Sequence, residues 1–210
     1  MMLNGEILLV RHGRPNVQWP RRCRHREFKD WMASYDAAEL DPESPPPQKL
    51  VELAAGSTLF LSSIRPRSYQ SALRLSDGRP IVQLRELDEV PLPHLPIPRI
   101  ELPTEVWVML TRLSHVAGYA GKAETIDEAR ARSRIAATRL ADYATNHNKV
   151  AVVAHGTINW LIGRHLKRQG WRVHHRGALG GYWHWRLFSL PGNHATDLRP
   201  KSFPDSLSLS

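Results

Sequence analysis

The chain has 210 residues, of which 41% are hydrophobic and 23% are charged, and its 29 Lys and Arg residues outweigh 20 Asp and Glu residues to give a formal net charge of +9. This length suits one domain that needs no disulfide or metal to hold its core together. The single cysteine, Cys23, excludes an intramolecular disulfide and a cysteine-rich zinc site. No apolar run approaches a membrane span and no signal peptide is recognisable, so we expect a soluble cytoplasmic protein. The positive charge favours anionic ligands.

The first predicted element is a short buried strand over residues 6–10, which ends before Gly13 and Pro15. Residues 18–47 differ in composition, because they begin with a basic cluster and end on consecutive prolines. We interpret them as a short helix inserted on a long loop. After this insertion the pattern predicts helices at 48–55, 66–75, 104–116, 125–146 and 157–169, and strands at 58–62, 81–84 and 149–154.

Proline content and polarity define the remaining segments. Five prolines make residues 90–103 an extended loop. Residues 182–188 alternate enough to predict an edge strand. Residues 191–210 are rich in Ser and polar residues, which predicts a disordered tail. We therefore expect one domain over residues 1–190.

The helix expected over 125–146 has a clear start signal. Thr125 and Glu128 form the capping-box pattern, in which each side chain satisfies a backbone N–H of the first turn. We expect Ala129, Ile135, Ala136 and Leu140 to be buried on the inner face of this helix.

The alternation of strands and helices predicts an α/β fold, a three-layer sandwich with a mostly parallel sheet, helices on both faces and an edge strand near the C-terminus. Residues 149–154 form a continuous apolar run, which is typical of the centre of such a sheet. Ligands of these sheets bind beyond the carboxyl ends of the strands.

Reactive or charged side chains follow four of the predicted strands. Arg11 and His12 follow the first, Arg65 and Arg67 the second, a carboxylate cluster at 86–89 the third, and His155 the fourth. Histidine can act as a nucleophile near neutral pH, and arginine suits phosphate oxygens. A carboxyl group can protonate a leaving alcohol. This set fits phosphoryl transfer through a covalent phosphohistidine.

Four motifs in the same order resemble those of the histidine phosphatase superfamily, the phosphoglycerate-mutase-like fold. They are residues 8–13 (LLVRHG), 62–72 (SSIRPRSYQSA), 84–86 (LRE) and 152–156 (VVAHG). Each follows a predicted strand, and the match spans residues 6–188. The residues after the acid motif, 87–93 (LDEVPLP), depart from the glycine-containing stretch of the mutases, so the resemblance favours a bacterial phosphatase-type branch.

The resemblance implies a role for each matched residue. His12 attacks the phosphoryl group, while Arg11, Arg67 and His155 hold its oxygens. Glu86 protonates the leaving oxygen and then activates the water that hydrolyses phospho-His12, and His155 counts with His12 and Glu86 as catalytic. The resemblance implies no metal and no cofactor.

Two assignments leave alternatives open. The offset from Ser63 favours Arg67 over Arg65 as the phosphate-binding arginine. Glu86 is favoured over Glu89 and Asp88 as the proton donor.

The basic insertion has several interpretations. Arg21, Arg22 and Arg24 could form a substrate lid over the site, a solvated surface, or a nucleic-acid contact. We interpret Trp31 and Tyr35, four residues apart, as the insertion's own packing.

The sequence therefore predicts a metal-independent phosphatase for a small phosphorylated substrate or a phosphoprotein. The alternatives are a non-catalytic phosphate-binding or scaffold protein on the same fold, and a phosphoglycerate-mutase-type phosphotransferase. A basic nucleic-acid-binding protein is least favoured, because no nucleic-acid-binding module is recognisable. No membrane partner is expected.

Overall fold

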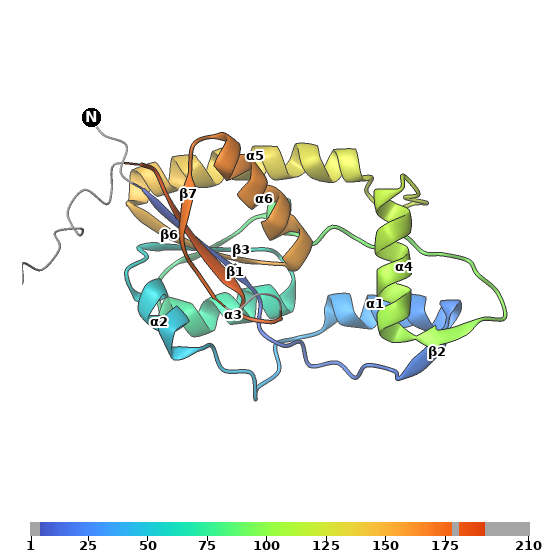
Figure 1. Cartoon of the computed structure of the whole chain (residues 1–210). Coiled ribbons are helices and arrows are strands. Elements are labelled where there is room, and N and C mark those ends of the chain that lie inside the picture. Colours follow the sequence, from blue (N-terminus) through green and yellow to red (C-terminus); the bar gives the residue numbers. More distant parts are fainter. Residues whose placement is uncertain (1–4, 178–180, 192–210) are drawn as a thin grey trace, which may run out of the picture.

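A six-stranded sheet lies at the centre of the computed structural model, which describes residues 5–177 and 181–191 (Figure 1). Its strands are β1 (Glu6–Arg11), β3 (Leu59–Ser62), β4 (Ile81–Gln83), β6 (Lys149–Ala154), β7 (Arg172–Arg176) and β8 (Trp185–Ser189), in the order β4-β3-β6-β1-β8-β7. The first four in that order are parallel, whereas β8 is antiparallel to β1 and β7 to β8. The predicted mostly parallel α/β sheet is confirmed.

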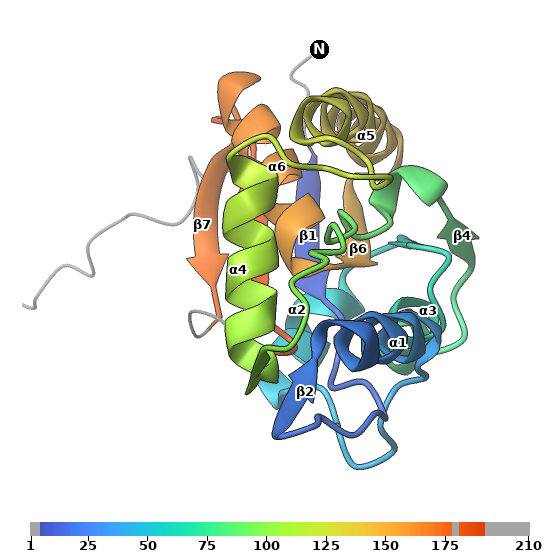
Figure 2. The same ribbon diagram turned by 90° about the vertical axis from the view of Figure 1, so that its right-hand side faces the viewer.

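Helices cover both faces of the sheet, which confirms the three layers (Figures 1 and 2). One face carries α5 (Ile126–His147) and α6 (Gly156–Arg168), and the other carries α2 (Gln48–Ala55) and α3 (Pro66–Ser76). Successive side chains of β1 point to opposite faces, so Ile7 and Leu9 join the first core and Leu8 and Val10 join the second. This double burial explains why the strand sequence is a continuous apolar run.

Strand β6 pairs with β1 on one side and with β3 on the other. The apolar run that predicted a central strand is therefore correct, and all residues of β6 after Lys149 are buried. Because these three strands are parallel neighbours, the residues that follow them meet at one edge of the sheet.

The C-terminal strands differ from the prediction. The strand predicted over 182–188 begins at Trp185, and it is not an edge strand because it lies between β1 and β7. The edge is β7, which sequence reasoning missed because its residues (RVHHR) are almost all polar and exposed. The predicted disordered tail falls, after residue 191, outside the described residues.

Helix α5 begins as predicted. The Thr125 hydroxyl accepts from the Glu128 backbone N–H at 3.2 Å, and the Glu128 carboxylate accepts from the Thr125 N–H at 2.8 Å. Ala129, Ala136 and Leu140 are buried, but Ile135 is 59% exposed, so that expectation is wrong. Ile135 lies at the margin of the apolar stripe of α5 and does not reach the sheet. Within the described residues, neither this 22-residue helix nor any other is apolar and long enough to cross a bilayer.

The basic insertion does not fold alone. It forms β2 (Arg22–Arg24) and α1 (His25–Ala37), and it packs against β5 (Glu101–Pro103) and α4 (Thr104–Val116). Strand β5 occupies the last three residues of the predicted proline-rich loop, so the prediction of a loop over all of 90–103 is wrong there, because pairing with β2 is a long-range contact. Strands β2 and β5 pair antiparallel, and Cys23, Phe28, Trp31 and Trp107 form a separate apolar core. We call these four elements the small lobe; it stands to one side of the main sheet (Figures 1 and 2). A one-turn 3-10 helix, η1 (Arg85–Leu87), lies between β4 and β5 in the sequence.

Candidate active site

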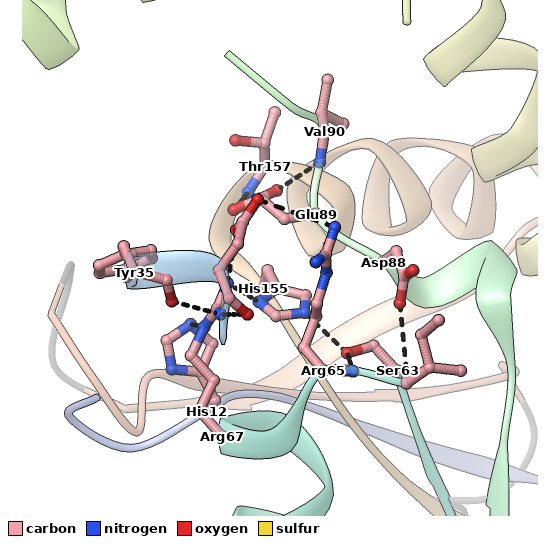
Figure 3. Close-up of polar contacts among 12 residues, drawn as sticks. His12, Tyr35, Ser63, Arg65, Arg67, Asp88, Glu89, Val90, His155 and Thr157 are labelled. Carbon is pink, nitrogen blue, oxygen red and sulfur yellow. Dashed lines mark hydrogen bonds and ion pairs between the residues drawn. The ribbon is translucent and has the colours of Figure 1, made fainter. Parts of the chain in front are cut away.

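Three of the predicted site residues meet beyond the carboxyl ends of the central strands (Figure 3). His12 directly follows β1, Arg67 lies in the first turn of α3 after β3, and His155 directly follows β6. The ring centroids of the two histidines are 4.9 Å apart, and the Arg67 side chain between them is completely buried. The parallel register of the three strands therefore brings together residues that are far apart in the sequence.

His12 presents one ring nitrogen to the cluster. Its Nδ1 lies 2.7 Å from the Gly13 carbonyl oxygen, which can only accept, so we assign the proton to Nδ1. Its Nε2 then carries a lone pair and accepts from Nε of Arg67 at 3.3 Å. Burial, followed by the positive charges of Arg67 and Arg11, lowers the pKa of His12 well below 6.5. His12 is therefore a neutral imidazole near neutral pH, with its unprotonated nitrogen toward Arg67.

His155 is held in the opposite tautomer. Its Nδ1 lies 3.4 Å from Nη2 of Arg67, which can only donate, so Nδ1 is the acceptor. Its Nε2 then donates to the Ser63 hydroxyl at 2.7 Å. Burial, followed by the nearby His12 and Arg67, lowers the pKa of His155 well below 6.5. Both histidines therefore direct a lone pair at the same guanidinium.

The insertion helix α1 anchors Arg67. Nη1 of Arg67 donates to the carbonyl oxygens of Tyr35 at 2.8 Å and Asp36 at 3.0 Å, and Nη2 lies 3.4 Å from the Asp36 carboxylate. The guanidinium also lies 4.7 Å from the centre of the Tyr35 ring. Arg65 also lies near the Asp36 carboxylate, at 3.7 Å, but its side chain is partly exposed. Of the two arginines that the sequence left open, Arg67 is therefore the one between the histidines.

Arg11 lies at the margin of the same site. Its Nη1 donates to the Gly181 carbonyl at 3.2 Å, and its guanidinium lies 4.9 Å from the centre of the Tyr182 ring. Among the described residues, its buried Nε has no hydrogen-bond acceptor. Arg11 also lines a cavity together with Tyr35 and Asp36, the two residues whose carbonyls hold Arg67.

The structure places Glu89, rather than Glu86, in that cavity. The Glu86 carboxylate leaves η1 toward α5 and pairs with Arg139 at 2.8 Å. The Glu89 carboxylate accepts from the backbone N–H groups of Thr157 at 3.4 Å and Ile158 at 3.2 Å, in the first turn of α6 (Figure 3). Because η1 ends at Leu87 and Asp88 is extended, Glu89 lies beyond the turn that carries Glu86, and the two side chains make different contacts.

The third carboxylate of the cluster, Asp88, has a structural contact. It accepts from the Ile64 N–H at 3.1 Å and so ties the loop after β3 to the loop after η1. Burial raises its pKa above the ordinary value of 3.8.

The three arginines considered as a lid are not brought to the cavity. Arg21, Arg22 and Arg24 are exposed, Arg22 lies 3.7 Å from Glu101, and Arg24 precedes α1. The insertion reaches the cavity through its aromatic residues and Asp36 instead. Trp31 and Tyr35 do pack within the small lobe, as interpreted, but they also form a wall of the cavity. Their four-residue spacing on a helix was the sequence signal for this wall.

Comparisons with known proteins place this geometry in context. The family model of the histidine phosphatase superfamily (branch 1) matches residues 48–184. The matched region contains Arg67, Glu89 and His155, whereas His12 precedes it and joins the cluster through the pairing of β1 with β6. Comparison with curated protein sequences gave no match.

Two solved structures illustrate the likeness of the fold. The ecdysone phosphate phosphatase from Bombix mori, in complex with tungstate, is 16% identical with a TM-score of 0.53, covering 98% of this chain and 96% of that one. A mutant phosphoserine phosphatase from Entamoeba histolytica, in complex with phosphoserine, is 16% identical with a TM-score of 0.51, covering 78% and 80%. At these identities the likeness is one of fold.

Proposed function

The chain belongs to the histidine phosphatase superfamily (branch 1), and from this premise we propose that it hydrolyses a phosphomonoester or a phosphorylated side chain through a phosphohistidine on His12. One observation carries the proposal. Nε2 of His12 and Nδ1 of His155 lie 3.3 Å and 3.4 Å from nitrogens of the same buried Arg67 guanidinium. A neutral nucleophile beside a fixed cation is the arrangement that a phosphoryl anion requires for attack.

The first half of the reaction transfers the phosphoryl group to the enzyme. The lone pair on Nε2 of His12 forms a bond to phosphorus, and the bond from phosphorus to the ester oxygen breaks with its electron pair on that oxygen. Glu89 donates a proton to the departing oxygen. Arg11, Arg67 and His155 hold the remaining phosphoryl oxygens, whose negative charge the two guanidiniums offset.

The second half regenerates the enzyme. The Glu89 carboxylate takes a proton from a water molecule, whose oxygen attacks phosphorus as the bond to Nε2 of His12 breaks. Inorganic phosphate then leaves, and Glu89 is again protonated. The Gly13 carbonyl supports these two reaction steps because it keeps the proton of His12 on Nδ1 and leaves Nε2 available in each turnover.

The test is hydrolysis of p-nitrophenyl phosphate by the wild type, by His12→Ala and by His175→Ala, each with and without a chelator. His175 is an exposed residue of β7 and serves as the matched control. We expect turnover in the wild type and the control, unaffected by the chelator, and none in His12→Ala. Turnover retained by a folded His12→Ala protein would contradict the nucleophile assignment. Phosphate binding without turnover in the wild type would favour the non-catalytic phosphate-binding protein instead.

A further inference from the structure

A cavity of about 160 Å³ opens beside the phosphoryl cluster, between the main sheet and the small lobe. Arg11, Asp36 and Glu89 line its inner side, and the rest of its wall comes mostly from aromatic and aliphatic residues. A cavity of roughly 150 Å³ holds one benzene ring. The space next to the expected leaving oxygen therefore matches a single ring or a short branched chain.

One wall of this cavity is a continuous aromatic surface. The ring centroids of Trp19 and Trp31 are 4.4 Å apart, and those of Trp31 and Tyr35 are 5.3 Å apart. Tyr35 in turn contacts Arg67. The aromatic wall therefore runs from the phosphoryl cluster outward to Trp19, which is 42% exposed. Such a wall stacks favourably against a flat or apolar leaving group.

The cavity is also lined by a half-buried cation that has no close ion-pair partner among the described residues. Arg112 of α4 lines the cavity, and among the described residues its buried Nη1 has no acceptor and its guanidinium forms no ion pair within 4.0 Å. The buried Arg67 and the half-buried Arg186, by contrast, both donate to backbone carbonyls. Burial lowers the pKa of Arg112, and Glu89 across the cavity opposes this shift. A partly buried charge with an unsatisfied donor costs free energy, and a bound anion that accepts from it would reduce that cost.

We propose that this cavity binds the leaving group of the substrate, and that the leaving group is a ring-sized apolar body carrying an anionic group, in its simplest form an aryl carboxylate, that pairs with Arg112. The inference rests on the proposed function, because it names the substrate class of the same site. The aromatic wall contacts the ring, and the guanidinium of Arg112 selects the anion.

The experiment compares 4-carboxyphenyl phosphate with its neutral isostere, 4-carbamoylphenyl phosphate. We expect the wild type to favour the carboxylate in kcat/KM, and Arg112→Met to reduce this preference at least about tenfold, since truncating one partner of a buried charged pair costs at least that much. Arg112→Lys should restore part of the preference. Arg130→Met, which removes an exposed arginine paired with Asp127, should keep it.

An equal loss of kcat/KM for both esters in Arg112→Met would overturn the inference, because Arg112 would then act through Glu89 and not on the substrate. An unchanged preference would overturn it as well. A binding measurement separates this inference from the proposed function. Calorimetry with 4-carboxybenzylphosphonate and 4-carbamoylbenzylphosphonate requires no turnover.

A preference for the carboxylated phosphonate that Arg112→Met abolishes would support the anion site even if neither ester were hydrolysed, and in that case only the proposed hydrolysis would fail. Hydrolysis of both esters with no preference in either assay would leave the phosphatase standing and remove the anion site.

Discussion

The two active-site histidines illustrate how single contacts decide chemistry at the residue scale. His12 keeps its proton on Nδ1 because a carbonyl accepts it, and His155 keeps its proton on Nε2 because Ser63 accepts it. Both remaining lone pairs then face Arg67. Nothing in the residue types alone fixes this arrangement, because either tautomer of a free imidazole is possible.

The lowered pKa values of His12 and His155 predict how stability depends on pH. In the unfolded chain both rings would take up a proton near pH 6.5, whereas in the folded protein they stay neutral to lower pH. Below pH 6.5 the unfolded state therefore binds more protons, and the free energy of unfolding falls as the pH falls, by up to about 1.4 kcal/mol per histidine per pH unit. Urea unfolding in phosphate-free buffer at pH 7.5 and 5.5 measures this difference.

Replacing His12 and His155 by Asn should make the stability difference between the two pH values smaller. Replacing the exposed His175 by Asn should leave it unchanged. If the double variant kept the full pH dependence of the wild type, other groups would have to account for it.

The positions of Glu86 and Glu89 predict opposite results for the same substitution. Glu89→Gln should slow hydrolysis of alkyl phosphates about 100-fold or more, because their leaving oxygen needs a proton. The loss should be smaller with p-nitrophenyl phosphate, whose leaving group departs as an anion. Glu86→Gln removes an ion pair with the partly exposed Arg139, so turnover should stay within about twofold. A large loss in Glu86→Gln, with Glu89→Gln unaffected, would restore the assignment that the motif resemblance implies.

At the scale of elements, the sequence predicted best where local signals and burial agree. Strand β6 is apolar throughout and lies at the sheet centre, and α5 begins at its capping box. Strand β7 was missed because a polar edge strand is held by its pairing with β8, and no periodicity in its own residues reports that pairing. Propensity and periodicity are local, whereas an edge strand depends on its partner.

The capping box of α5 offers a test of how much one helix start contributes. Thr125→Ala removes the hydroxyl that accepts from the Glu128 N–H and should lower the free energy of unfolding by about 1 kcal/mol. Thr145→Ala changes the same residue type at an exposed position inside α5 and should be near neutral or slightly stabilising. Urea unfolding measures both, and p-nitrophenyl phosphate turnover should be unchanged. Equal stability of the two variants would mean that the cap contributes little.

At the scale of the whole molecule, the site lies between two cores that the sequence predicted unequally. The meeting of His12, Arg67 and His155 could be inferred, because a parallel sheet gathers the carboxyl ends of its strands at one edge. Asp36 and Arg112 could not be inferred, because they belong to the small lobe, whose two segments are joined by the pairing of β2 with β5. That pairing is long-range and has no local signature.

Trp107 is the largest completely buried side chain of the small-lobe core. It is completely buried, its ring lies 5.8 Å from that of Phe28, and its indole N–H donates to the Cys23 carbonyl at 2.8 Å. Trp107→Ala should therefore cost the lobe about 3–5 kcal/mol. The main sheet has its own two cores and should stay folded. Hydrogen exchange should accelerate in α1 and α4 while the amides of α5 and β6 keep their protection.

The same substitution should also affect catalysis, because α1 supplies the backbone carbonyls that hold Arg67 and the aromatic wall of the cavity. We expect kcat/KM for aryl phosphates to fall at least about tenfold, mainly through a higher KM, since a loosened wall binds the ring less well. Trp160→Ala, at a residue of α6 that is 52% exposed, is the matched control and should change neither measurement. Faster exchange throughout the molecule would show that the lobe and the sheet unfold as one unit, and the site would then owe its shape to the whole domain and not to the lobe.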